Sequence, residues 1–410
     1  MVTPRRILFI GLNYAPEPIG IGPYSAGLAE ALVERGHTVE AVVGQPYYPE
    51  WKLYSRFKRR WQTAHENGVK ITRCPHYIPA NPTGSKRMAH HASFASSAYP
   101  AARRARRELQ PDLVFTVAPS MIAAPVAVRM ARRAGVPLWM HVQDFEVGAA
   151  LATGLIDSES RTAAAAARFE DRMLHSADLV STISHPMCQL LEEKGVANDR
   201  ILEMRNWANH AGAFAEADGS AFRREWGLEG KTVALYSGNI ANKQGLDIII
   251  EAARLMEARE DIVFVICGEG PNRLKLEHRA NDLGNVIFRD LQPENRIGDL
   301  LTMADIHLLP QLHDAADLVL PSKLGNMLAS GRPVVATVRP GTGIARELVD
   351  CGIVVPPEVP EAIVSALEAL AAHPDYRETM GRAAAERARI AWSKKSVVDR
   401  FEEGLERLLG

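Results

Sequence analysis

The chain has 410 residues, 47% of them hydrophobic and 24% charged, which predicts a globular protein of two domains of about 200 residues each. Its formal net charge is −1, but residues 1–110 carry 16 Lys/Arg against 7 Asp/Glu, which favours an anionic partner for this part. Four scattered cysteines without a CxxC pair argue against a zinc site or a disulfide framework and favour a reducing compartment.

The N-terminal half opens on a strand, a glycine-containing loop, a helix and a second strand. We expect the strands over residues 7–12 and 38–43, and the helix over 24–35. This βαβ start predicts a doubly wound domain. The loop segment GIGPYSAG lacks the G-x-G-x-x-G spacing of a dinucleotide site, so we interpret Gly20 and Gly22 as a loop that lets backbone approach a substrate. A plain tight turn is the alternative.

Two basic stretches follow, over residues 47–61 and 86–107. Residues 51–110 hold 13 Lys/Arg against 2 Asp/Glu, and the first stretch interleaves these cations with aromatic residues. Such stretches suit an anionic lipid headgroup surface. Nucleic acid is a rival partner, but no nucleic-acid-reading motif accompanies the charge. A solvated basic face is the third interpretation.

The rest of this half continues as alternating strands and helices. A strand over 137–142 runs into Gln143-Asp144-Phe145-Glu146, and a polar cluster directly after a strand is typical of an active-site edge. A helix cap by Asp144 is the alternative. The small, polar segment 209–220 is the best candidate for a linker between domains.

The second half repeats the pattern. We expect strands over 232–236, 262–267, 286–288 and 305–310, with helices over 245–258, 272–283 and 296–303 between them. Glycine turns follow the first two of these strands. Two Rossmann-like halves with such turns predict a ligand site in a cleft between the domains.

The segment 318–335, LVLPSKLGNMLASGRPVV, organises this half. Pro321 ends a loop, and Ser322 is expected to cap a short helix that is followed by a strand over 334–337. A helix N-terminus in a loop after a parallel strand presents free N–H groups and partial positive charge, which suits a diphosphate. An ordinary packing turn explains the pattern equally well.

The order SGN…KQG, CGEGP, ADIHLLP and LPSKLGNMLASGRPVV resembles the family-4 retaining glycosyltransferases of the GT-B fold. The N-terminal NYAPEPIGIGPYS, QPYYPEW, HVQDFEV and STIS are similar to the bacterial exopolysaccharide branch typified by the colanic acid fucosyltransferase. The resemblance implies two doubly wound α/β domains facing across a cleft. The two domains are an acceptor-binding domain over 1–208 and a nucleotide-sugar-binding domain over 209–385, and a C-terminal helix over 386–410 crosses back to the N-terminal domain.

The resemblance also assigns roles to residues. It implies catalytic roles for Lys243, Asp144, Asp317 and Lys323. The residues that it implies in donor binding are Gly20, Gly22, Gly238, Asn239, Lys243, Gly268, Glu269, Gly270, Pro271, Leu320, Ser322, Lys323 and Asn326. Asn326 stands where the family has the second Glu of its E-x7-E motif. The first Glu falls at Leu318, with Asp317 one residue away.

The implied reaction is the transfer of a sugar, with fucose from GDP-fucose favoured over UDP-linked and other donors, to a lipid-linked oligosaccharide. The sequence contains no Asp-x-Asp, so neither a metal nor another cofactor is expected beside the donor. The first apolar run is too short for a signal peptide, and no apolar run is long enough to span a bilayer. We therefore expect a cytoplasmic enzyme in peripheral contact with the anionic inner face of the plasma membrane. A sugar-nucleotide 2-epimerase on the same fold, or a non-catalytic nucleotide-sugar-binding assembly subunit, are the alternatives.

Overall fold

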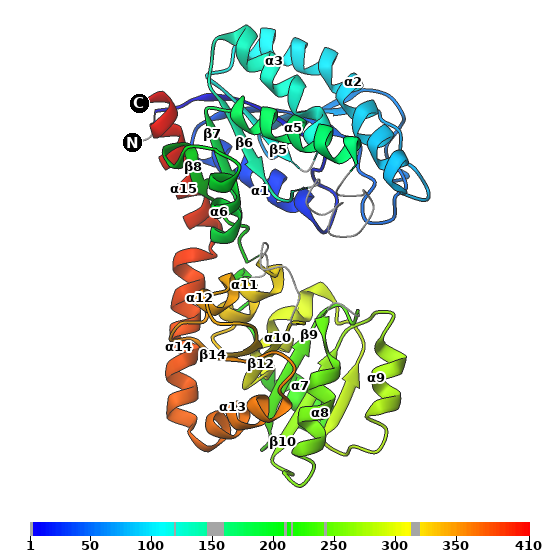
Figure 1. The fold of residues 1–410 in the computed structure, drawn as a ribbon, viewed down its shortest axis with the longest axis vertical. Coiled ribbons are helices and arrows are strands. Elements are labelled where there is room, and N and C mark those ends of the chain that lie inside the picture. The colour runs from blue at the N-terminus through cyan, green and yellow to red at the C-terminus, as the bar shows by residue number, and fades with distance from the viewer. Residues whose placement is uncertain are drawn as a thin grey trace. The chain divides into compact units, whose positions relative to one another are not determined.

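The structure, a computed structural model, describes residues 3–118, 120–145, 160–208, 211–214, 216–241, 244–312 and 320–410. Two compact units are distinguished: an N-terminal unit of Met1–Met204 with Val398–Gly410, and a C-terminal unit of Arg205–Val397 (Figure 1). These units divide at 204/205 and 397/398, whereas the sequence predicted boundaries at 208/209 and 385/386.

The N-terminal unit contains an eight-stranded sheet in the order β3-β4-β2-β1-β5-β6-β7-β8. All neighbouring strands are parallel except the pair β3 and β4. The order reverses beside β1, because β2 lies on one side of it and β5 on the other. The strands are β1 (Arg6–Gly11), β2 (Thr38–Gly44), β3 (Gln62–Glu66), β4 (Val69–Cys74), β5 (Leu113–Ala118), β6 (Leu138–Val142), β7 (Leu179–Thr182) and β8 (Ile201–Glu203).

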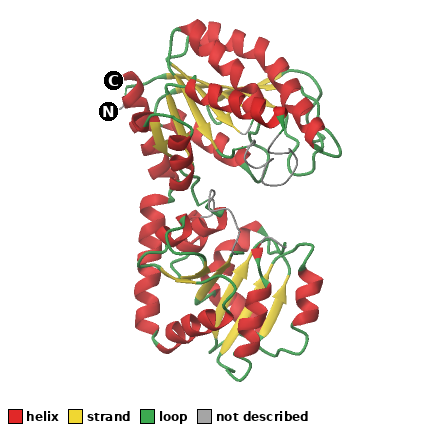
Figure 2. Cartoon of the chain, viewed as in Figure 1, coloured by secondary structure: helices red, strands yellow, loops and turns green. Residues whose placement is uncertain are grey.

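Helices cover this sheet, as the red ribbons around the yellow strands show (Figure 2). On one face, apolar residues of β1, β5 and β6 form a continuous core with α2 and α3. The other face carries a cluster of aromatic rings from β1, β5, β6 and α15. The helices of the unit are α1 (Ile21–Glu34), α2 (Gly84–Leu109), α3 (Ala124–Ala134), α5 (Arg161–His175), α6 (His185–Glu193) and the C-terminal α15 (Lys394–Leu409).

The C-terminal helix α15 packs on the N-terminal sheet, but the single helix predicted over 386–410 is wrong, because α14 (Pro374–Ala391) extends beyond 386 and α15 begins only at Lys394. Phe401 of α15 stacks on Trp139 of β6 with 4.4 Å between ring centroids. A Cβ at Gly404 would lie 2.2 Å from the Trp139 ring, so only glycine allows this approach. The ion pair of Arg35 with Asp399, 2.5 Å between the Arg Nη2 and the Asp Oδ1, adds a contact to α1's end.

The C-terminal unit contains a six-stranded parallel sheet in the order β11-β10-β9-β12-β13-β14. The order reverses beside β9, and ligands of such sheets bind at the carboxyl ends of the strands near this point. The strands are β9 (Thr232–Ser237), β10 (Ile262–Cys267), β11 (Val286–Arg289), β12 (Ile306–Pro310), β13 (Val334–Thr337) and β14 (Gly352–Val355).

Helices pack on both faces of this second sheet as well. The core on one face joins β9, β10 and β12 to α8, α9 and α13, and the opposite face packs on α7, α10, α11 and α14. The predicted doubly wound α/β architecture is therefore present in both units. The helices are α7 (Gly219–Trp226), α8 (Asp247–Leu255), α9 (Arg273–Arg279), α10 (Ile297–Met303), α11 (Ser322–Ala329), α12 (Gly343–Glu347), α13 (Pro360–Ala372) and α14 (Pro374–Ala391).

Candidate active site

In the C-terminal unit, two loops interlock at the carboxyl ends of β9 and β10. The Gly238 N–H donates to the Cys267 carbonyl at 3.0 Å, and the Ile240 N–H donates to the Glu269 carbonyl at 2.8 Å. A Cβ at Gly268 would lie 1.9 Å from the Gly238 carbonyl oxygen, and the Gly268 φ of +153° also disfavours a side chain. Gly268 is therefore required by the packing of one loop on the other.

Lys323 places a positive charge beside these loops. Its Nζ lies 4.2 Å from the centroid of the Tyr236 ring. A Cβ at Gly238 would be 3.8 Å from the same Nζ. Lys323 is partly buried, and burial lowers its pKa to about 7. In the part of the chain that the structure describes, no carboxylate pairs with this ammonium group, which suits a site for an anion.

The start of α11 differs from the prediction. Ser322 is the first residue of the helix rather than its cap, and Pro321 occupies the N-cap position without a side-chain hydrogen bond. The prediction of a serine cap is wrong because the helix begins one residue earlier than that pattern requires. Among the described residues, no N-cap side chain accepts from the first turn of α11, although the Leu324 N–H donates to the Pro321 carbonyl at 2.9 Å. Two further predicted donor residues flank Ser322 in the sequence. Leu320 before it is buried, and Asn326 after it is half-buried.

The turn after β10 is braced by an arginine that the sequence analysis did not single out. Arg273 pairs with Glu269, 2.6 Å between Nη1 and Oε1, and also with Glu277 and Asp290. Its Nη1 donates to the Gly268 carbonyl at 3.0 Å. The predicted donor residues Glu269 and Pro271 thus belong to a turn in which the Arg273 charge is neutralised by three carboxylates. The Glu–Arg–Glu spacing of four residues was the available signal.

In the N-terminal unit, the glycine loop is tied to the loop after β2 by a buried carboxylate. Glu17, 2% exposed, accepts the Tyr47 and Tyr48 N–H groups at 3.0 and 3.1 Å. A Cβ at Gly22 would lie 2.9 Å from the Glu17 Cβ, and Gly20 has a φ of +75° at the start of α1. Glu17 was missed, although an acid between two prolines in APEPIG was a visible signal.

The other predicted edge of this unit lies at the end of β6. Asp144 is exposed there, while Gln143 is 7% exposed and its amide contacts the His141 ring. The predictions for Lys243, Asp317, Leu318 and Glu146 fall outside the described residues. So does the segment after Phe145 that a cap by Asp144 would require.

The predicted lipid-facing aromatic stretch is divided in the structure. Tyr47 is 4% exposed, because its ring packs against those of Trp51, His76 and His90. The expectation of a lipid-facing side chain is therefore wrong for Tyr47. Trp61, at the other end of the stretch, is 53% exposed.

Within the described residues, no helix has the length and apolar composition needed to cross a bilayer. The described residues also bring together no group of three His, Cys, Asp or Glu side chains suited to a metal ion.

Comparison with known proteins identifies the family. Residues 20–207 match the glycosyl transferase 4-like domain, and residues 219–387 match the glycosyl transferases group 1. The chain is 37% identical over 409 residues to the Escherichia coli (strain K12) "Putative colanic acid biosynthesis glycosyl transferase WcaI", covering 97% of this chain and 98% of the relative. The chain belongs to the group 1 glycosyltransferases. Family membership favours glycosyl transfer over the two alternatives, an epimerase and a non-catalytic subunit.

This glycosyltransferase also shares its fold with solved structures. Sucrose-phosphate synthase from Thermosynechococcus elongatus has a TM-score of 0.70 at 15% identity, covering 98% of this chain and 99% of that one. Anabaena Alr3699/HepE in complex with UDP has a TM-score of 0.66 at 16% identity, covering 98% and 100%. WaaG, a glycosyltransferase involved in lipopolysaccharide biosynthesis, has a TM-score of 0.63 at 17% identity, again covering 98% and 100%. The predicted GT-B class of α/β fold is confirmed.

Proposed function

We propose that this glycosyltransferase moves a sugar, with retention of configuration, from a nucleoside-diphosphate donor to a lipid-linked oligosaccharide in exopolysaccharide biosynthesis. The name of the E. coli relative supports the pathway, and the sequence resemblance favours GDP-fucose as the donor. The observation that carries the donor site is Lys323, a partly buried cation without a carboxylate partner among the described residues, beside the loops after β9 and β10.

The chemistry of transfer explains why a cation belongs there. When the bond between the anomeric carbon and the β-phosphate oxygen breaks, negative charge grows on the departing diphosphate. Lys323 and N–H groups at the start of α11 would stabilise that charge, with Lys243 as a second cation. Retention is proposed to arise from attack of the acceptor hydroxyl on the face that the diphosphate leaves, with the hydroxyl proton passing to the departing diphosphate oxygen. Asp144 and Asp317 are the proposed catalytic carboxylates, and no metal is required.

A panel of nucleotides tests the donor. Among GDP, UDP and dTDP, we expect GDP to raise the unfolding temperature most, because ligand binding stabilises the folded state in proportion to affinity and concentration. At 100 times Kd the stabilisation is about 2.7 kcal/mol. Guanosine, which lacks the diphosphate, is the control and should have little effect. A larger effect of UDP would contradict GDP-fucose as donor, and no effect of any diphosphate would contradict the donor site.

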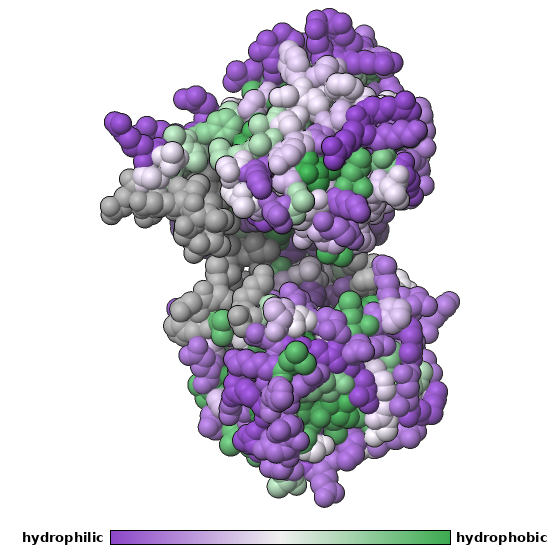
Figure 3. All heavy atoms as spheres, turned by 90° about the vertical axis from the view of Figure 1, so that its right-hand side faces the viewer, coloured by the Kyte–Doolittle hydropathy of each residue, from purple (hydrophilic) through white to green (hydrophobic). Residues whose placement is uncertain are grey.

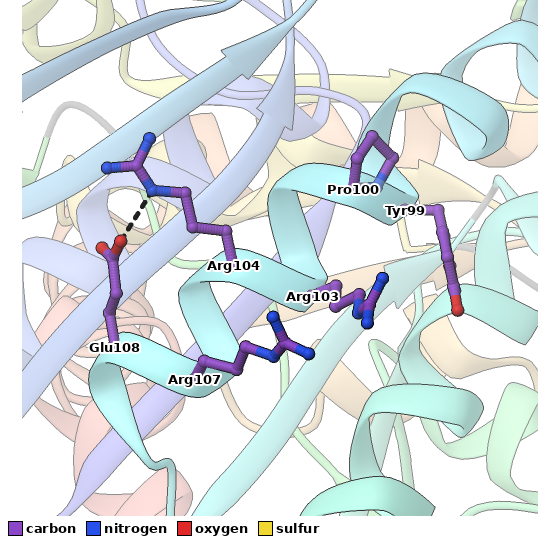
Figure 4. Close-up of a pocket in the computed structure, with 6 residues that line it drawn as sticks. All are labelled: Tyr99, Pro100, Arg103, Arg104, Arg107 and Glu108. Carbon is purple, nitrogen blue, oxygen red and sulfur yellow. Dashed lines mark hydrogen bonds and ion pairs between the residues drawn. The ribbon is translucent and has the colours of Figure 1, made fainter.

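The acceptor side of the proposal rests on a basic surface of α2 and α3. On α2, Arg103, Arg104, Arg107, Tyr99, Pro100 and Glu108 line a hollow of about 410 Å³. Figure 4 shows Arg103 and Arg107 on one side of the helix, while Arg104 turns to Glu108. Arg129 and Arg133 of α3 donate to the Tyr99 hydroxyl at 3.2 and 3.0 Å.

Hydrophilic side chains cover the end of the N-terminal unit where α2 and α3 lie (Figures 1 and 3). Arg103 and Arg107 are exposed, and within the described residues neither forms an ion pair. A surface of this charge suits the anionic headgroups of a membrane that holds a lipid-linked acceptor. We propose peripheral contact with the inner face of the plasma membrane through this surface.

Charge reversal tests this contact. The double substitution Arg103→Glu and Arg107→Glu should weaken binding to phosphatidylglycerol vesicles by about 30-fold or more, since each basic residue near such a surface contributes about 1 kcal/mol. Binding is measured by co-sedimentation at low and physiological salt. Arg382→Glu with Arg389→Glu, two exposed arginines of α14, is the matched control and should change binding little. Equal losses in the two double variants would contradict a specific surface.

A further inference from the structure

A buried chain of polar side chains runs across β6 and β7 of the N-terminal sheet. The Trp139 indole N–H donates to the Ser181 hydroxyl at 2.8 Å. The His141 Nδ1 contacts the same hydroxyl at 2.8 Å, and the His141 Nε2 contacts the Gln143 amide nitrogen at 2.9 Å. All four side chains are less than a tenth exposed. Polar groups buried in a sheet core require partners, and here each is the partner of the next.

The donors and acceptors of this chain are consistent with one arrangement of protons. With the Gln143 amide donating to Nε2, the His141 proton lies on Nδ1, and the Ser181 oxygen accepts from both rings. Burial lowers the pKa of His141 to about 3, so the ring is neutral at physiological pH. The Phe115 ring stacks on it with 6.3 Å between centroids. The imidazole therefore has one orientation rather than several.

The row of hydrogen-bonded side chains ends at Trp139 on one side and at Gln143 on the other. Trp139 contacts the C-terminal helix, and Gln143 precedes the proposed catalytic residue Asp144. At the first end, the Trp139 ring stacks on Phe401 and packs against Gly404, both of α15. At the other end, Gln143 is the first residue after β6, and its N–H donates to the Ala118 carbonyl at the end of β5 at 3.2 Å. The next residue is Asp144, which is exposed at the carboxyl edge of the sheet.

We infer that His141, held by Ser181 and Trp139, is a positioning residue that orients Gln143 and thereby sets Asp144 for the transfer reaction. The inference rests on the proposed function, because it concerns the carboxylate proposed to act in transfer. The hydrogen bond that the Gln143 amide donates to this buried ring holds the residue next to Asp144, and small displacements of catalytic groups are costly in rate.

Removing one hydroxyl tests the inference. Ser181→Ala eliminates both hydrogen bonds to the serine with little change in volume. We expect kcat to fall about 10-fold or more, with the donor Kd from calorimetry unchanged, because the donor site lies in the other unit. Ser181→Thr retains the hydroxyl and should retain most of kcat.

A matched control separates positioning from stability. Thr116 of β5 is also buried. Its hydroxyl donates to the Ile10 carbonyl at 2.9 Å and not to the row of side chains from Trp139 to Gln143. Thr116→Val should lower the unfolding temperature about as much as Ser181→Ala but leave kcat near the wild-type value. Faster hydrogen exchange at residues 141–145 in Ser181→Ala, and not in Thr116→Val, gives a readout that does not depend on activity.

Gln143→Met provides a second route if Ser181→Ala does not fold. It removes the amide that contacts the His141 ring, and its loss of kcat should not add to that of Ser181→Ala, since both variants interrupt the same row of hydrogen-bonded side chains. Equal kcat in Ser181→Ala and Thr116→Val, or fully additive losses, would overturn the inference. If the wild-type enzyme bound no nucleoside diphosphate and transferred no sugar, the proposed function would fail instead, whatever the exchange data showed.

Discussion

Replacing Lys323 by methionine is expected to lower the affinity for a nucleoside diphosphate by about 10- to 100-fold, because hydrogen bonds to charged groups contribute about 1.5–3 kcal/mol. The fall in kcat/KM should be larger, about 10²- to 10³-fold, since charge on the diphosphate grows as the glycosidic bond breaks. Methionine keeps about the length of the side chain over the Tyr236 ring and removes the charge together with its N–H donors. Calorimetry and initial-rate kinetics measure the two effects.

The same variant should be more stable than the wild-type enzyme at pH 7. Burial lowers the pKa of folded Lys323 to about 7, whereas a lysine in the unfolded chain titrates near 10.4. Between these values the unfolded chain binds more protons, so this group makes stability rise with pH and is most unfavourable at and below pH 7. Lys323→Met buries no ammonium group, so this loss of folding stability at pH 7 is absent from the variant. Lower activity together with a higher unfolding temperature would exclude misfolding as the cause.

The pKa of Lys323 also predicts how donor binding changes with pH. The free enzyme loses the ammonium charge as pH rises through about 7, so affinity for the sugar nucleotide should fall over that range. Lys323→Arg, which stays charged, should remove this dependence. Lys275→Met, at an exposed lysine of α9 in the same unit, is the control and should leave affinity unchanged. Wild-type affinity in Lys323→Met would disprove the diphosphate site.

Replacing Gly268 by alanine is expected to have the second largest effect, on both stability and donor binding. The added Cβ would lie 1.9 Å from the Gly238 carbonyl oxygen, and backbone cannot give way as a flexible side chain does. Strain of φ and overpacking each cost about 1–3 kcal/mol, so we expect a loss of about 3 kcal/mol or more. The loops after β9 and β10 would separate, and nucleotide affinity should fall at least 10-fold.

Gly284→Ala is the matched control for this prediction. Gly284 lies in the same unit, after α9, and a Cβ there would meet no atom within 4 Å. Differential scanning calorimetry, which follows the two units separately if they unfold separately, measures stability, and titration with GDP and UDP measures affinity. Similar small effects of the two alanines would show that the loops after β9 and β10 are free to move apart. They would then not form a fixed donor site.

Local sequence patterns predicted many elements closely. The expected strand over 262–267 is β10, and the expected strand over 334–337 is β13, because short apolar runs bounded by turn residues are buried strands of a parallel sheet. The fold class followed from the alternation of such runs with helical periodicity. By contrast, α2 was read only as a basic stretch. Its buried face consists of His90, Phe94 and small residues, and Pro100 lies inside the helix, so its apolar signal is weak.

The candidate site was predicted in part. The glycine turns and Lys323 were identified from motifs, but the motifs did not reveal that Gly268 faces the backbone of Gly238. Glu17 was overlooked because its three partners come from two loops about 30 residues apart in the sequence. Ser322 was assigned as a cap because a cap differs from a first helical residue only in backbone angles, which the residue type does not specify.

By itself, the sequence determined the two doubly wound halves, the family and the residue types available for binding a diphosphate. These depend on local periodicity and on motifs contained in short segments. Only the tertiary structure decided which of those residues are buried, paired or left with a charge. Burial, pKa and hydrogen-bond partners depend on segments far apart in the chain, as with Lys323 over Tyr236 and Trp139 beneath Phe401.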